Sequence, residues 1–441
     1  MRIGKAKVSL GLVLFMFLML VGMATAEDVT EITFWHHEAP AHRVKAIQEV
    51  INLFEAENPN IRVYQEVVSW DDAYARTISG IRSKTIPDFQ WDIPELNIVA
   101  NQAGGIIPVT DLVKEIDEQY GYFHSLLAPY YYEGEYWGVP IWTMPHVFLY
   151  RPSYLEKYMG TSTPPSTWEE VLEYAEKLTV DTTGDGEPDI FGIGLTAGHN
   201  LCTQQQAWSV MSSYGVNVYD SEGNVTFDSE ETVKALTMYK KLYEFAPPAA
   251  SGWAWGEVEL NFVAGNIAMF PYFGGIQRRL FEAEDLDLAA TLIPLPETGG
   301  RETAFSHPNA IHIFKVAEER GTLEAVKDFV RFMMRPDIAA MYTAVQEPGS
   351  FLPVTEAAVE APEYWEDPII SAYEEINQTL VEAVPRSNLY GFEHGHASNL
   401  SIGAVSGANL LAEVIQKVVL EGLSPEEAAK WGEAEIKRYA E

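Results

Sequence analysis

The chain has 441 residues and a formal net charge of −35, with 64 acidic side chains against 29 lysines and arginines. So strong an acidic excess repels phosphate backbones and anionic lipid surfaces, which excludes a nucleic-acid partner. A hydrophobic content of 47% in a chain of this length predicts two packed domains. The single cysteine, Cys202, has no intramolecular disulfide partner, so packing must hold the fold.

The segment 1–26 is typical of a secretory signal peptide. Three basic residues precede an apolar run over 8–23, and Ala24-Thr25-Ala26 is a small-residue cleavage site. After removal the first residue is Glu27, whereas a lipid-anchored product would begin with cysteine. We therefore expect a periplasmic or extracellular protein without a lipid anchor.

The start of the mature chain alternates between strand and helix patterns. Residues 31–35 and 61–68 read as strands, and apolar side chains recur at helical spacing between positions 44 and 54. A second helix is predicted over 71–83 with Asp71 as its N-cap. This alternation favours a mostly parallel sheet with helices on both faces.

Later segments add further helices. An aromatic, proline-bracketed stretch over 130–145 reads as a crossing between domains. A helix is predicted over 169–178, with Ser166 or Thr167 as its cap. Additional helices are predicted over 318–334, over 409–420 and from position 424 onward.

Two motifs contain residue types that bind metal ions, but neither has the complete spacing of a known metal site. His37 and His42 are five positions apart with a proline between them, which misses the four-residue spacing of a zinc protease helix. A second motif places Asp181, Thr183, Asp185 and Asp189 at positions one, three, five and nine of a calcium loop. The bidentate glutamate expected at position twelve is replaced by Gly192. The loop is interpreted as a polar turn, with a structural cation as the alternative.

Signals for nucleophilic or nucleotide chemistry are absent from the sequence: it has no Gly-x-Ser-x-Gly, no Gly-x-x-x-x-Gly-Lys and no Gly-x-Gly-x-x-Gly. Cys202 is interpreted as a small buried hydrophobe. The tryptophans are more informative, because several stand beside polar residues near predicted strand ends or loops. A sugar offers apolar faces and a rim of hydroxyls, so this combination favours a carbohydrate cleft. The set comprises Trp35, Trp70, Trp91, Trp142, Trp253 and Trp255.

An ordered series of segments resembles the family 1 extracellular solute-binding proteins of bacterial ABC importers. The most typical phrase is Phe262-Val-Ala-Gly-Asn-Ile-Ala-Met269. Other segments of the series are Ile32-Thr-Phe-Trp-His36, Gly104-Gly-Ile-Ile-Pro-Val-Thr-Asp111, Glu135-Tyr-Trp-Gly-Val-Pro140, Pro164-Pro-Ser-Thr-Trp-Glu-Glu170 and Ser350-Phe-Leu-Pro353. Their order covers nearly the whole mature chain.

The resemblance implies a two-lobed α/β clam, each lobe a mostly parallel sheet flanked by helices. The predicted lobes are 27–141 with 297–350, and 142–296 with 351–441. The chain would cross between them near Pro140, Pro296 and Ser350. A monomer of this kind captures ligand in the interlobe cleft by hinge closure and delivers it to ABC permease subunits in the membrane. Neither catalysis nor a cofactor is implied.

The resemblance also implies which residues contact the ligand. The family's usual Gly-x-Trp is replaced here by Tyr272-Phe273-Gly274-Gly275, so one of these rings is expected to stack on the ligand instead. The full predicted set is Trp35, His36, Glu38, Trp70, Asp71, Trp91, Asp92, Trp142, Trp253, Trp255, Tyr272, Phe273, His307, Arg386 and His394.

Alternative functions remain open at this point. Arg43, Arg151 and Arg386 leave room for a sugar phosphate or another phosphorylated polyol, and carboxylates lining the cleft would suit a polyamine or peptide. A secreted glycoside hydrolase would need a pair of carboxyl groups roughly 5–9.5 Å apart in the cleft. The same fold could also serve as a sensor input. The leading prediction is an importer's binding protein for a mono- or oligosaccharide.

Overall fold

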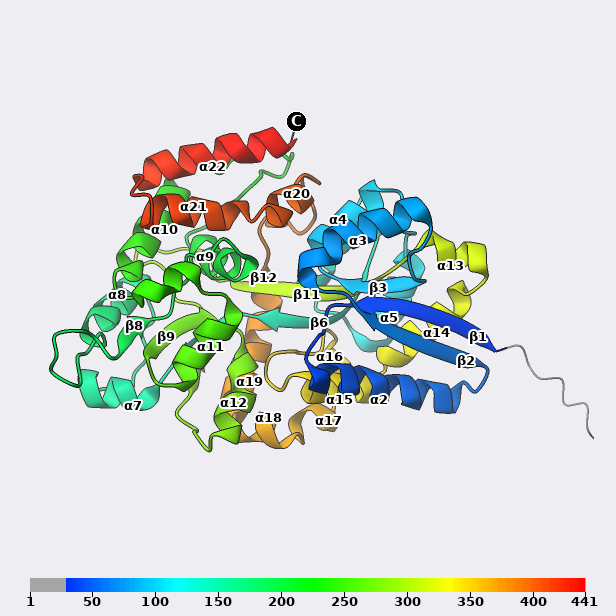
Figure 1. Cartoon of the computed structure of the whole chain (residues 1–441), viewed down its shortest axis with the longest axis horizontal. Helices are drawn as coiled ribbons and strands as arrows, with labels where there is room; N and C mark the ends of the chain where they lie inside the picture. The colour runs from blue at the N-terminus through cyan, green and yellow to red at the C-terminus, as the bar shows by residue number, and fades with distance from the viewer. Residues whose placement is uncertain (1–28, 441) are drawn as a thin grey trace, which may run out of the picture.

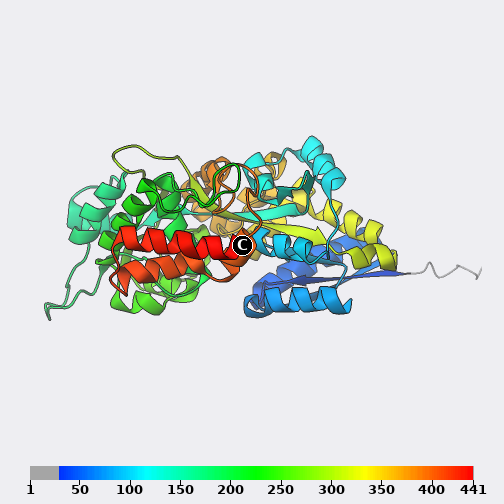
Figure 2. The same ribbon diagram turned by 90° about the horizontal axis from the view of Figure 1, so that it is seen from above.

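The computed structural model describes residues 29–440, so the predicted signal segment 1–26 lies outside the described residues. The chain forms two lobes side by side, with β6 (Val139–Pro145) and β11 (Ala304–Ile313) lying between them (Figures 1 and 2). Within 29–440, no helix is both long and apolar enough to cross a bilayer.

The first lobe is built on a six-stranded sheet of order β12-β11-β3-β1-β2, with β6 also paired to β11. β1 runs parallel to β2 and to β3, whereas β11 is antiparallel to β3 and β6. Phe34 of β1 packs on Phe329 of helix α14, and the next residue, Trp35, faces α3 on the opposite side of the sheet. Helices therefore cover both faces, as predicted. Besides β6 and β11, the strands of this sheet are β1 (Thr30–His36), β2 (Ile61–Val67), β3 (Phe89–Asp92) and β12 (Ser387–Asn388). The two helices that cover its faces at Phe34 and Trp35 are α14 (Leu323–Met333) and α3 (Trp70–Ser83).

The predicted elements are confirmed to within a few residues, with two corrections. The cap of α3 is Ser69, whose hydroxyl accepts a hydrogen bond from the amide of Asp72, rather than Asp71. The helix predicted over 318–334 is two helices, because the chain turns at Gly321, whose φ is 74°. Thr167 caps the helix over 168–177 through a reciprocal capping box with Glu170.

The second lobe contains a four-stranded sheet of order β10-β7-β9-β8. Only the pairing of β8 with β9 is parallel, while β7 pairs antiparallel with β9 and β10. This sheet is therefore mixed, in contrast to the mostly parallel sheet expected. The physical reason is that both sheet neighbours of β7, which are β9 and β10, come from much later in the chain, so long-range pairing rather than a strand-helix-strand crossover sets the strand directions. The strands are β7 (Val147–Tyr150), β8 (Phe191–Ile193), β9 (Ile267–Tyr272) and β10 (Ala289–Thr291).

The end of the chain returns to touch both lobes. Helix α20 (Ile402–Gly407) packs on α4 (Pro94–Gln102) of the first lobe, and α21 (Leu410–Val419) packs on α9 (Leu201–Ser213) of the second. The other α-helices of at least four residues are α2 (Ala41–Glu57), α5 (Thr110–Tyr120), α6 (His124–Leu127), α8 (Trp168–Lys177), α10 (Glu230–Tyr243), α11 (Trp255–Val263), α12 (Gln277–Glu282), α13 (Lys315–Arg320), α15 (Pro336–Gln346), α16 (Glu356–Val359), α17 (Pro362–Trp365), α18 (Pro368–Ala372), α19 (Glu374–Ala383) and α22 (Pro425–Ala440).

The carboxylate of Glu393 ties this returning segment to the second lobe, and its protonation should affect stability. Its Oε1 accepts hydrogen bonds from the amides of Val218 and Gly391, at 2.9 and 2.8 Å. Burial raises the pKa of Glu393 from 4.5 to about 7. The folded state therefore retains a proton that the unfolded state releases between those two values, so stability should fall as pH rises through this window.

We expect Glu393→Gln to flatten the fall in unfolding free energy between pH 5 and pH 8. In the native sequence this fall amounts to on the order of 2 kcal/mol. Denaturant unfolding of both proteins at pH 5 and pH 8 measures it. An unchanged slope in the variant would contradict the assignment to Glu393. A matched control is Glu324→Gln at an exposed carboxylate, which should leave the slope as it is.

Candidate functional site

A cavity of about 290 Å³ lies between the two lobes. The residues that follow β1 and β3, with parts of α2 and α3, form one wall; α9, α11 and the residue after β9 form the other. Strands β6 and β11 and the segment 350–351 form the floor. Its lining residues are His37, Glu38, Ala39, Pro40, Arg43, Trp70, Ile93, Trp142, Met144, Leu201, Gln205, Trp255, Glu259, Phe273, His307, Asn309, Ser350 and Phe351.

The floor follows from strand geometry. Trp142 and Met144 alternate on one face of β6, directly opposite Asn309 and His307 of β11. A β-bulge interrupts the ladder immediately after Asn309, and such bulges commonly re-aim side chains beside binding sites. The Phe351 ring stacks on Trp142 with a centroid distance of 3.9 Å and an interplanar angle of 20°.

The first-lobe wall combines a ring platform with a buried histidine. The Trp70 ring lies 4.1 Å from the His37 ring, centroid to centroid, and Trp70 is 36% exposed. His37 Nδ1 donates to the Val68 carbonyl at 2.9 Å, and its Nε2 lies 3.8 Å from Asp92 Oδ2. Burial alone would lower the pKa of His37, but Asp92 raises it above the ordinary value.

The same wall holds the cleft's arginine between two carboxylates. Arg43 Nη1 lies 2.8 Å from Glu38 Oε2, and Arg43 Nη2 lies 2.8 Å from Glu347 Oε2. Its guanidinium also lies over the Phe351 ring, 4.8 Å from the centroid. Burial alone would lower the pKa of Arg43, but the two carboxylates raise it. The positive charge is therefore neutralised within the protein.

The second-lobe wall places a carboxyl group and two aromatic side chains against the cavity. Glu259 contacts Arg279 at 3.2 Å and accepts a hydrogen bond from the Tyr272 hydroxyl at 3.1 Å. Burial raises the pKa of Glu259. Trp255 Nε1 donates to Gln205 Oε1 at 2.9 Å, and Phe273 completes this wall.

A hydrogen-bonded pair at the floor connects both lobes. His307 Nε2 donates to the Glu95 carboxylate, 3.1 Å from Oε1 and 3.2 Å from Oε2, and Gln205 Nε2 donates to His307 Nδ1 at 3.2 Å. The Ser406 hydroxyl of α20 donates to the same Glu95 at 3.1 Å. Burial alone would raise the pKa of Glu95, but its interaction with His307 lowers it.

Several of the sequence-predicted residues meet in this cavity. Those that line it are Glu38, Trp70, Trp142, Trp255, Phe273 and His307. Asp92 and Tyr272 lie behind the walls, where they hold His37 and Glu259. His36 is buried against Gln65 and accepts a hydrogen bond from the Glu38 amide. Asp71 lies in the first turn of α3.

The other predicted residues do not line the cleft. Trp91 is buried in the core against Tyr342, and Trp253 is also buried in the core. Arg386 pairs with Glu302 and Glu382, and His394 bonds to the Tyr219 carbonyl. The family resemblance implies these positions, and a matching position along the chain does not fix the direction in which a side chain points.

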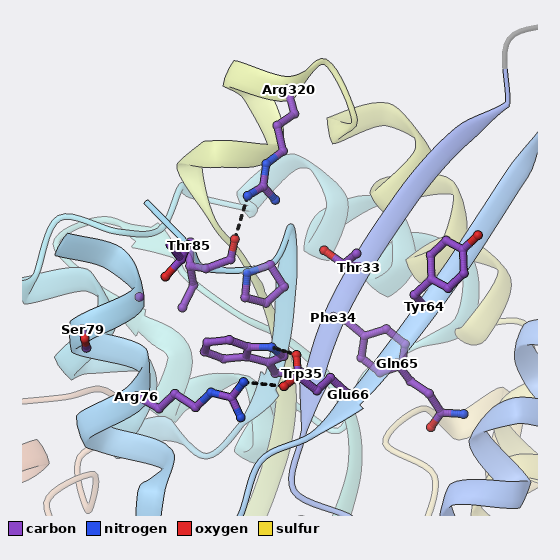
Figure 3. A pocket seen from close by; sticks show the side chains of 13 residues that line it. Thr33, Phe34, Trp35, Tyr64, Gln65, Glu66, Arg76, Ser79, Thr85 and Arg320 are labelled. Atoms are coloured by element: carbon purple, nitrogen blue, oxygen red, sulfur yellow. Dashed lines mark hydrogen bonds and ion pairs between the residues drawn. The ribbon is translucent and has the colours of Figure 1, made fainter. Parts of the chain in front are cut away.

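Trp35 lies in a different place, a groove of about 710 Å³ on the first lobe that shares no lining residue with the cleft (Figure 3). Its Nε1 donates to Glu66 at 2.8 Å, and the Arg76 guanidinium lies over its ring at 4.4 Å from the centroid. The first lobe itself therefore supplies a hydrogen-bond acceptor for the Trp35 Nε1 and a cation over the Trp35 ring.

Sequence reasoning missed several lining residues. Met144 and Asn309 stand two positions from Trp142 and His307, so strand alternation was the signal that could have found them. Gln205 and Glu259 lie on helices whose cleft-facing side depends on tertiary packing. The missed lining residues are His37, Ala39, Pro40, Ile93, Met144, Leu201, Gln205, Glu259, Asn309, Ser350 and Phe351, while Arg43, considered above as a contact for a phosphorylated ligand, also lines the cavity.

The candidate calcium loop is an exposed turn. The Asp181 carboxylate accepts hydrogen bonds from the amides of Thr183, Gly184 and Gly186, and Asp189 accepts from Thr182 and Thr183. Across the described part of the chain, no three His, Cys, Asp or Glu side chains are grouped to hold a metal ion. Calcium binding by this loop stays a prediction.

With this geometry in view, sequence comparison identifies the class. Residues 49–372 match the family model of bacterial extracellular solute-binding proteins, and the chain belongs to that family. It is 24% identical over 411 residues to the putative ABC transporter periplasmic-binding protein YcjN of Escherichia coli K12, covering 91% of each chain. It is 21% identical over 360 residues to the sn-glycerol-3-phosphate-binding periplasmic protein UgpB of E. coli, covering 77% of each.

Solved structures share the fold. T. maritima MalE3 with bound maltose aligns with a TM-score of 0.76 at 18% identity, covering 93% of this chain and 100% of that one. A solute-binding protein from Thermotoga lettingae with bound alpha-D-tagatose aligns with a TM-score of 0.74 at 19% identity, with the same coverage. The two-lobed α/β architecture expected from the sequence is therefore confirmed.

The pairing of Glu95 with His307 should carry much of the stability at the junction. We expect Glu95→Gln to lower the free energy of unfolding by about 3 kcal/mol, because it leaves a buried ring without its charged partner. Because the folded pKa of Glu95 is depressed, its contribution is present above the ordinary value of 4.5 and is lost as pH falls through the lower folded value.

Denaturant unfolding at pH 7 and pH 4 measures both effects, and the difference between native sequence and variant should shrink at acid pH. Glu324→Gln, at a surface pair with Lys327, is the matched control and should cost less than about 1 kcal/mol. An equal cost for the two variants would argue against the assigned role of Glu95.

Proposed function

We propose that this protein captures a neutral sugar in the interlobe cleft and delivers it to an ABC permease in the membrane. The observation that carries the proposal is the composition of the cavity: aromatic rings, among them the part-exposed Trp70, stand beside amide, hydroxyl and imidazole groups. Flat rings suit the apolar faces of a sugar, and planar polar groups suit its hydroxyls. Maltose and tagatose bound to structural neighbours support the same class of ligand.

Charge separates a neutral sugar from a phosphorylated one. Among the described residues that line the cleft, Arg43 is the one arginine or lysine, and Glu38 and Glu347 already hold it. A phosphate would have to compete with two carboxylates for that guanidinium. The likeness to UgpB is thus outweighed by the electrostatics of this cavity.

Capture by hinge closure follows from the position of the cavity. A ligand between two walls gains contacts with both when the lobes approach, so binding shifts the balance toward the closed form. We propose that no bond of the sugar is broken. The ligand is then released to permease subunits outside this chain.

Thermal unfolding of the chain from Glu27 onward, with D-tagatose, ribitol, maltose, maltotriose and sn-glycerol 3-phosphate, tests the proposal. A ligand that binds the folded state alone stabilises it by about 2.7 kcal/mol at a hundredfold excess over Kd. We expect one of the neutral compounds to raise Tm and to be recovered unchanged by chromatography after prolonged incubation. Cleavage would favour a glycoside-acting enzyme, and a response to the phosphate ester alone would overturn the neutral ligand.

Removing the part-exposed Trp70 ring should weaken binding of whichever neutral compound raises Tm. We expect Trp70→Ala to raise its Kd about tenfold, because stacking on an aromatic ring contributes about 0.5–1.5 kcal/mol. Tyr64→Ala, an aromatic side chain that is 51% exposed outside the cleft, should leave Kd unchanged. Titration calorimetry measures both, and equal effects would place the ligand elsewhere.

A further inference from the structure

Three donor groups at the floor of the cleft have no hydrogen-bonding partner among residues 29–440: Trp142 Nε1, Asn309 Nδ2 and Ser350 Oγ. The three residues are 2%, 3% and 0% exposed, and all three line the cavity. A buried donor without a partner calls for an explanation, and a bound ligand, ion or water is one. Their convergence on one cavity points to an external acceptor.

The three donors come from the three segments of the floor. Trp142 stands on β6 and Asn309 is its direct cross-strand partner on β11, where the bulge follows. Ser350 precedes Phe351, which stacks on the Trp142 ring. Phe351 covers one face of that indole, which leaves at most the other face for stacking, and the N–H is the polar group that Trp142 brings to the floor.

We propose that Trp142, Asn309 and Ser350 form an anchoring subsite for oxygen acceptors of the sugar, its hydroxyl or ring oxygens. This inference rests on the proposed function and deepens it, because it assigns the floor a polar role and leaves stacking to the walls. None of the three side chains carries a charge, so the floor favours a hydroxyl oxygen over an ammonium group at that end of the ligand. A site built to hydrogen-bond a hydroxyl also discriminates strongly against the deoxy analogue.

The arrangement also indicates an order of contacts. Two of the donors stand on the paired strands β6 and β11, which belong to the same sheet as β1 and β3 of the first-lobe wall. These two donors and the first-lobe wall are therefore held together whether the lobes are apart or closed. Ligand meets them first, and the second-lobe wall completes its contacts on closure.

The variant Trp142→Phe tests the proposal, because it keeps an aromatic ring against Phe351 and removes the N–H. Trp91→Phe is a matched control: Trp91 Nε1 is also buried without a partner in the described chain, and Trp91 is likewise 2% exposed, but it does not line the cleft. Calorimetric titration of the native chain and both variants uses D-tagatose, ribitol, maltose and maltotriose as probes.

We expect Trp142→Phe to raise the Kd of the bound probe about tenfold and Trp91→Phe to leave it unchanged. Ser350→Ala should also raise the Kd of that probe. Replacing the probe by a deoxy analogue should cost less affinity in the variants than in the native chain, because the variants have already lost a donor for the missing hydroxyl. In ¹⁵N-tryptophan spectra, the indole N–H of Trp142 should shift downfield on saturation while that of Trp91 stays in place.

Two results would overturn the inference, and only the second of them would also overturn the proposed function. Tight binding of a probe with the same Kd in Trp142→Phe and Ser350→Ala, and with a stationary Trp142 indole signal, rejects the floor subsite and leaves the proposed function intact. Absence of binding by all four probes rejects the neutral sugar and the subsite together.

Discussion

The junction of the lobes depends on Glu95, a carboxylate with no exposure to solvent that is held by side chains from two other parts of the chain. His307 reaches it from β11 and Ser406 from α20, while Gln205 of α9 holds the other nitrogen of the same imidazole. A buried carboxylate is costly unless it is bonded in this way. The pair therefore fixes where β11, α4 and the returning C-terminal segment sit, and with them the floor of the cleft.

The floor of the cleft belongs to the first sheet. β6 and β11 form a ladder within that sheet, and the chain enters the second lobe directly from β6. The first-lobe wall follows β1 and β3 of the same sheet, whereas the opposite wall follows β9 of the second sheet and includes parts of α9 and α11. In the proposed closure, the floor and the first-lobe wall therefore stay together while the second-lobe wall approaches them.

Local signals predicted the fold well, because strand and helix periodicity and capping act over a few residues. The strand at Thr30–His36, the helix after it and the Thr167 capping box are examples. The mixed second sheet was not predictable in the same way, since strand direction is set by pairing between β7 and β9, more than a hundred residues apart. The order of family motifs supplied the two-lobed architecture that local patterns alone left open.

The candidate site shows where sequence reasoning stops. Trp35 and Trp142 look alike as aromatic residues in or beside strands, yet one packs under Arg76 in a separate groove and the other stands in the cleft floor. Alternation on a strand says that neighbours face opposite sides, but not which side faces the ligand. At Trp142 a neighbouring ring decides what the side chain can offer: Phe351 covers one of its faces, and its Nε1 has no hydrogen-bonding partner among the described residues. The proposed hydrogen-bonding role of this tryptophan, in place of stacking, therefore depends on contacts that only the fold shows.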